Sequence, residues 1–72
     1  MSAARKNTMG DTLTPQQTEL VDCYERLVAL LRANRGQLAP FEERNALKAI
    51  AALWQVMNGL DMDPGQLDDI GA

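Results

Sequence analysis

Apolar side chains recur three and four positions apart in two stretches of the chain, the spacing typical of amphipathic helices. In the first stretch they fill about half of a helix circumference, and they are Leu20, Val21, Cys23, Tyr24, Leu27, Val28, Leu30 and Leu31. In the second they fill a similar arc, and they are Ala46, Leu47, Ala49, Ile50, Leu53, Trp54, Val56, Met57 and Leu60. The pattern predicts an all-α protein, with no strand-like alternation of useful length.

Capping residues set the bounds of both predicted helices. Thr14-Pro15-Gln16-Gln17 combines an N-cap residue, a proline at the first helical position and a glutamine three residues after the cap, which predicts a capping box. Gly36 is placed to end this helix, predicted at about 14–35. Pro40 begins the second, predicted at about 40–58, and Asn58-Gly59 is placed to close it in a Schellman-type end.

The two ends of the chain lack this periodicity. Residues 1–13 are interpreted as a flexible arm. Residues 61–72 carry four aspartates and no basic residue, so they form an acidic tail in which Asp63-Pro64 can start one short helical turn. The tail also combines apolar anchor residues with acidic ones, which makes it a candidate docking segment for a basic partner. The residues of this segment are Leu67, Asp68, Asp69 and Ile70.

The connection between the helices is short, which predicts an antiparallel hairpin over residues 14–60. Each apolar arc is about twice as wide as contact with one neighbouring helix needs, so the hairpin is expected to dimerise into a four-helix bundle or to bind a partner helix of another protein. The residues predicted to form that interface are Leu27, Leu30, Leu31, Ile50, Leu53, Trp54 and Met57.

Charge and composition exclude several classes. Residues 12–60 carry five basic and five acidic side chains, so a nucleic-acid-binding surface is not expected. No apolar run reaches the roughly 18–20 residues of a membrane span, and the first residues lack the hydrophobic stretch of a signal peptide. We therefore expect a cytoplasmic protein that binds neither nucleic acid nor membrane.

The chain offers little chemistry for catalysis or metal binding. It has no histidine and one cysteine, and Ser2 is its only serine. Cys23 therefore lacks a base that would activate it, and we interpret it as a buried thiol in the core. The aspartates from Asp61 onward lack the ligand positions of a calcium loop. No cofactor and no metal are expected.

These observations favour a small protein–protein interaction module: an adaptor, an accessory subunit or a regulator. The alternative is a small-molecule-binding protein, or a minimal enzyme without covalent chemistry, whose apolar pocket forms between subunits. That pocket would be lined by Tyr24, Trp54, Glu25 and Glu43. Core packing of Tyr24 and Trp54 is the simpler interpretation, and a packed core at this place would count against the alternative.

Overall fold

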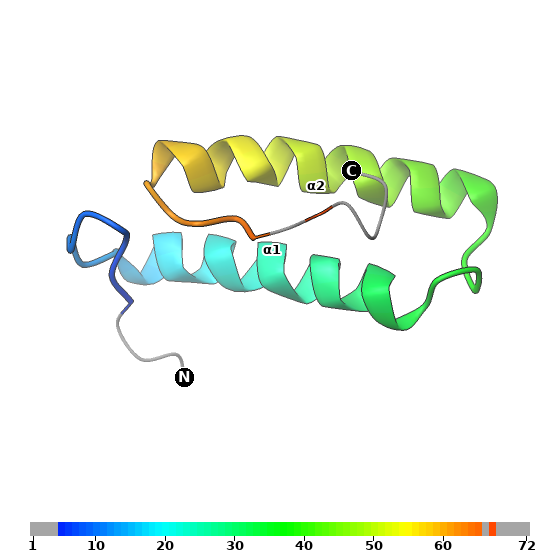
Figure 1. Cartoon of the computed structure of the whole chain (residues 1–72), viewed down its shortest axis with the longest axis horizontal. Coiled ribbons are helices and arrows are strands. Elements are labelled where there is room, and N and C mark those ends of the chain that lie inside the picture. Colours follow the sequence, from blue (N-terminus) through cyan, green and yellow to red (C-terminus); the bar gives the residue numbers. More distant parts are fainter. Residues whose placement is uncertain (1–4, 66, 68–72) are drawn as a thin grey trace.

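The structure is a computed structural model, and it describes residues 5–65 and 67 of the 72-residue chain. Helix α1 spans Pro15–Ala33 and helix α2 spans Pro40–Gly59. The two helices contact each other and are joined by a short connection, so they form a helical hairpin (Figure 1). The predicted all-α hairpin is thereby confirmed. Among the described residues, no helix is long and apolar enough to cross a membrane.

Helix α1 begins with the capping box that the sequence predicts. The Thr14 hydroxyl accepts a hydrogen bond from the N–H of Gln17 at 3.1 Å, and Gln17 Oε1 accepts one from the N–H of Thr14 at 2.8 Å. The helix ends two residues before its predicted end. Asn34 leaves the helical conformation, and its side-chain amide donates to the Leu30 carbonyl at 2.8 Å, which satisfies one of the carbonyls left free at a helix end. Gly36 follows with a φ of 78°.

Helix α2 begins at Pro40 with only half of such a box. Glu42 Oε1 accepts a hydrogen bond from the N–H of Ala39 at 2.8 Å. Ala39, at the N-cap, makes no side-chain hydrogen bond to the helix. Because an alanine has no oxygen to offer, the first turn of α2 lacks the acceptor that Thr14 supplies to α1.

The C-terminal end of α2 is a Schellman motif centred two residues later than predicted. Asp61, not Gly59, takes the left-handed conformation, with a φ of 58°, and Gly59 is the last helical residue. The N–H of Met62 donates to the Met57 carbonyl at 2.9 Å, and the N–H of Asp61 donates to the Asn58 carbonyl at 3.1 Å. Thr8 also donates to the Asp61 carbonyl, through both its N–H and its hydroxyl, so a distant segment helps to hold the turn there.

Residues 5–13 form a closed loop that contacts the helices, which differs from the arm that the sequence pattern indicated. An isolated antiparallel bridge pairs Lys6 with Thr12. The side chain of Asn7 organises the loop, because its oxygen accepts from the N–H groups of Met9 and Asp11. Its amide nitrogen donates to the Leu60 carbonyl at 3.0 Å. The loop is thus attached to the end of α2, 53 residues away in the sequence.

The core lies between the two helices and is extended by both ends of the chain. Its buried residues are Leu13, Val21, Tyr24, Val28, Leu31, Ile50 and Met57. Leu13 comes from the loop at residues 5–13. Met62 and Leu67 come from the segment after α2, which turns back along the hairpin (Figure 1), and both pack against the core. Residues 62–65 are not helical, and the rest of the predicted short turn lies largely outside the described residues.

Candidate interaction surface

The apolar arc of α1 divides into two rows of four residues. The inner row is buried and consists of Val21, Tyr24, Val28 and Leu31. The outer row consists of Leu20, Cys23, Leu27 and Leu30, at successive spacings of three, four and three residues. Such spacing places side chains along one face of a helix, as in the apolar seam of a coiled coil. The sequence pattern alone predicts one apolar face that contains both rows. In the folded chain, the inner row packs in the core and the outer row lies mostly outside it.

The outer row is the part of α1 that leaves apolar surface open to solvent. Leu20 is 44% exposed and Leu30 is 49% exposed. Cys23 is also exposed. Leu27, which lies between Cys23 and Leu30 in the row, is half-buried against the core. At 100° per residue these four side chains are turned by roughly 100° to 180° from Val21, which is fully buried. The row extends for about 15 Å along the helix.

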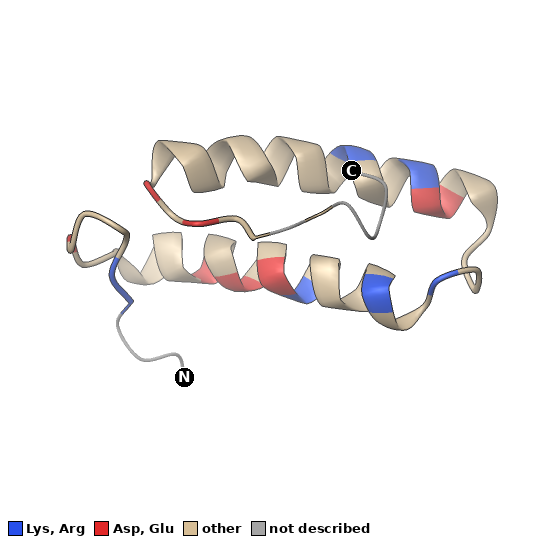
Figure 2. Ribbon diagram, viewed as in Figure 1, with Lys and Arg blue, Asp and Glu red and all other residues tan. Residues whose placement is uncertain are grey.

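Opposite charges lie along the edge of the outer row that is turned away from the inner row, which we call the free edge. Glu19 and Arg26 are both exposed and stand seven residues apart on the same side of α1. Within the part of the chain that the structure describes, neither forms an ion pair. Figure 2 shows acidic residues in the first half of α1 and basic residues towards its C-terminal end. The edge of the row therefore changes sign along the helix.

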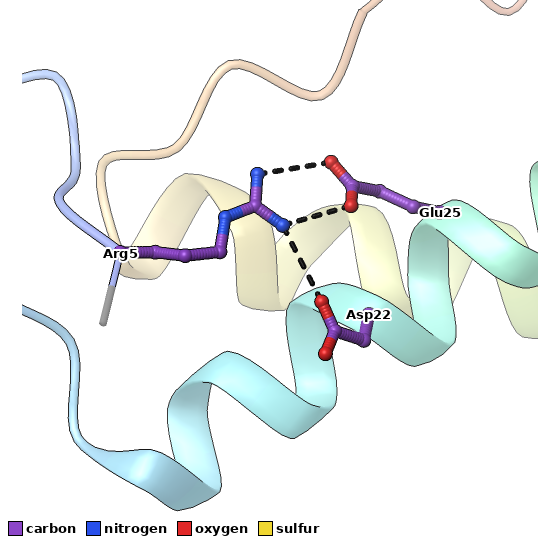
Figure 3. Close-up of polar contacts among 3 residues, drawn as sticks. All are labelled: Arg5, Asp22 and Glu25. Atoms are coloured by element: carbon purple, nitrogen blue, oxygen red, sulfur yellow. Dashed lines mark hydrogen bonds and ion pairs between the residues drawn. The ribbon is translucent and has the colours of Figure 1, made fainter. Parts of the chain in front are cut away.

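Another charged cluster, on a different side of α1, attaches the N-terminal loop. Arg5 donates to both carboxylate oxygens of Glu25, at 2.8 and 3.1 Å, and lies 3.4 Å from Asp22 (Figure 3). The hydrogen bond to Glu25 is the main cause that raises the pKa of Arg5 above its ordinary value. Asp22 and Glu25 are turned by more than 90° from most of the outer row. The Arg5 cluster thus leaves the outer row uncovered.

The four residues predicted to line a ligand pocket are not gathered into one site. Tyr24 is buried, and its hydroxyl donates to the Pro64 carbonyl at 3.0 Å. Burial is the main cause that raises the pKa of Tyr24. Glu25 is paired with Arg5. Glu43 precedes Trp54 by eleven residues, which is about 16 Å along α2. Trp54 is half-buried and packs against the core, as the simpler interpretation of the sequence expects.

Three of the seven residues predicted to form the interface are buried inside the single chain. Leu31, Ile50 and Met57 are at most 2% exposed. These three side chains are covered within the chain itself, and Leu13, Met62 and Leu67 from the two ends of the chain belong to or pack against the same core. Leu27, Leu53 and Trp54 are half-buried. Of the predicted set, Leu30 is the residue that stays prominently exposed.

Cys23 is exposed, which corrects its interpretation as a buried core thiol. It lies about 160° around the helix from Val21, so it faces away from the core. The interface prediction also omitted Leu20, Met9 and Phe41, whose side chains are exposed. For Leu20 the signal was present, since it begins the regular spacing that continues through Cys23. Met9 and Phe41 belong to no periodic pattern.

The predicted docking tail is only partly within the described residues. Leu67 is half-buried and packs against the core, so it contacts the chain's own helices. Asp68, Asp69 and Ile70 lie outside the described residues. Across residues 5–65 and 67, no three cysteine, aspartate or glutamate side chains are grouped so that they could hold a metal ion.

The chain matches no protein-family model, no curated protein and no solved structure.

Proposed function

We propose that the protein is a small helical interaction module, an adaptor, accessory subunit or regulator, which binds another helix through the outer row of α1. The observation that carries this proposal is the exposure of Leu20 and Leu30 on the face that also presents Cys23 and Leu27. Apolar side chains arranged in this way are typical of surfaces that pack against a partner helix.

The energetics favour an occupied row. Fully burying a leucine side chain contributes roughly 1.5–3 kcal/mol, so covering the exposed halves of Leu20 and Leu30 contributes about 1 kcal/mol each. Tighter packing of Leu27 and Cys23 adds to this. The partner is either a second hairpin, in which case four helices pack as a bundle, or a helix of another protein. In both cases the binding surface is the same.

The proposal is tested by photo-crosslinking in the cells that produce the protein. A photoreactive amino acid replaces Leu30 in one variant and Ala29 in a matched control. Both positions are exposed and lie next to each other in α1, but Ala29 is turned about 140° from the middle of the outer row. We expect position 30 to form a discrete crosslinked species and position 29 to form none.

Mass spectrometry of the crosslinked species then identifies the partner. A crosslink from position 30 to any protein, including a second copy of this chain, supports the proposed function. The absence of a discrete product from position 30, or equal products from both positions, contradicts it. Circular dichroism of the purified variants checks that both keep the helical fold.

A further inference from the structure

We propose that the occupant of the outer row is a second copy of the chain, with the two α1 helices antiparallel and the two-fold axis beside Cys23. This inference rests on the proposed function, because it takes the outer row as the binding surface. It goes further in naming the partner, its direction and its register. Charge complementarity along the free edge of the row, set by Glu19 and Arg26, argues for it.

The register follows from the positions of the charged and apolar residues around Cys23. In an antiparallel pair with its axis beside residue 23, the level of residues 19–20 of one helix faces the level of residues 26–27 of the other. Glu19 then meets Arg26 of the second copy, and the two-fold axis repeats this pair on the other side. One edge of α1 is thus electrostatically self-complementary.

The same axis also matches the apolar side chains. Leu20 lies opposite Leu27 of the second copy, and Cys23 lies beside Cys23 of the second copy. A two-fold contact requires a surface that is complementary to itself. The edge with Glu19 and Arg26 meets this condition in charge. Leu20, Cys23 and Leu27 meet it in apolar character, whereas Leu30 comes to the level of Gln16 of the second copy.

A parallel arrangement of the two α1 helices satisfies the requirement for self-complementarity less well. Its two-fold axis runs along the helices, so the Glu19/Arg26 edges of the two copies lie on opposite sides of the pair and neither edge meets its complement. Both arrangements place Cys23 beside Cys23 of the second copy, so the charged residues Glu19 and Arg26 are what distinguish antiparallel from parallel helices.

Charge exchange tests the direction of the helices. Light scattering and sedimentation over a concentration series give the dimer dissociation constant of the purified chain. Glu19→Arg and Arg26→Glu each turn two attractive contacts into repulsive ones, and we expect each to weaken the dimer by about tenfold. The double variant Glu19→Arg/Arg26→Glu restores the pairing, and we expect a dissociation constant within about threefold of the original. Because both side chains are exposed, the hairpin is expected to fold in all three variants.

Disulfide trapping tests the register. Mild oxidation with diamide, which takes up the two electrons and two protons released by two thiols, joins Cys23 to Cys23 if these residues lie beside each other. We expect rapid formation of a covalent dimer by the wild-type chain. The Cys23→Ser/Ala29→Cys variant moves the thiol to another face of the same helix, and we expect little covalent dimer from it. Cys23→Ser alone is expected to dimerise without the covalent bond.

The outcomes separate this inference from the proposed function. A chain that stays monomeric at every concentration overturns the inference, and so does a dimer that Glu19→Arg and Arg26→Glu leave unchanged. Equal trapping of Cys23 and of the cysteine placed at position 29 overturns the register. If position 30 crosslinks to a different protein while the purified chain is monomeric, the proposed function holds and the second copy is excluded as the partner.

Discussion

At the scale of the residue, Tyr24 links the C-terminal segment to the core. Its ring is buried in α1, and its hydroxyl donates to the carbonyl of Pro64. Because burial raises the pKa of Tyr24 above 10.0, the folded chain holds the phenol proton more firmly than the unfolded chain does. The associated stabilisation is fully present below pH 10 and is lost as the pH rises through the raised pKa.

This predicts that Tyr24→Phe makes the protein less sensitive to alkaline pH. At neutral pH the variant loses the hydrogen bond to Pro64 and is expected to be about 1 kcal/mol less stable. Above pH 10 the free energy of unfolding of the wild type is expected to fall more steeply than that of the variant. Denaturant unfolding across the pH range measures both. Since Tyr24 is the only tyrosine, phenolate absorbance reports its ionisation directly. Parallel pH profiles for the two proteins would contradict the prediction.

Residues such as Cys23 and Asp61 mark a limit of the sequence pattern. The helix periodicity places Cys23 at the edge of an apolar arc, but it does not say which half of that arc meets the core. Asp61 takes the left-handed conformation that the sequence pattern assigns to Gly59. Its carbonyl is bound by Thr8, and no local pattern of residues reveals a contact across 53 positions. Tertiary packing determines both the exposure of Cys23 and the left-handed conformation of Asp61.

At the scale of the element, local signals predicted the helix starts well. The Thr14–Gln17 capping box involves residues only three apart, so the sequence contains all the information that the turn needs. Pro40 marks the start of α2 for the same reason. The loop at residues 5–13 has no comparable local signature. Asn7 and Thr8 bind the backbone of Leu60 and Asp61, which only the folded chain brings near.

The unequal caps of the two helices give a prediction at this scale. Ala39 already has the extended backbone of an N-cap, with φ −63° and ψ 152°, but it offers no side-chain acceptor. We expect Ala39→Ser to stabilise the protein by about 1 kcal/mol, since the hydroxyl can accept from the first turn of α2. Thr14→Ala removes the corresponding acceptor from α1 and is expected to cost about the same. Thermal unfolding of both variants measures the pair, and a loss of stability in Ala39→Ser would contradict the argument.

At the scale of the whole molecule, the chain covers part of its hairpin with its own ends. Leu13 packs on the core from one side, and Met62 and Leu67 pack on it from the segment that follows α2. The chain therefore covers only part of the wide apolar faces of its hairpin. On the core side the ends of the chain add to the cluster in which Ile50 and Met57 are buried. The outer row of α1 stays exposed and is the part for which we propose a partner.

Because one part of the hairpin is covered and another is exposed, we expect two methionines near opposite ends of the chain to contribute very differently to the free energy of unfolding. Met62 packs against the core, whereas Met9 is 72% exposed. Met62→Ala removes packed apolar atoms, and because Met62 is only half-buried we expect it to lower the free energy of unfolding by about 1–2 kcal/mol. Met9→Ala makes the same chemical change without losing packing, and we expect an effect within about 0.5 kcal/mol. Urea unfolding followed by Trp54 fluorescence, at one fixed protein concentration so that any association is held constant, measures both. An effect of Met62→Ala as small as that of Met9→Ala would show that the packing of Met62 does not stabilise the fold, and the face of the hairpin that Met62 covers would then also be open to a partner.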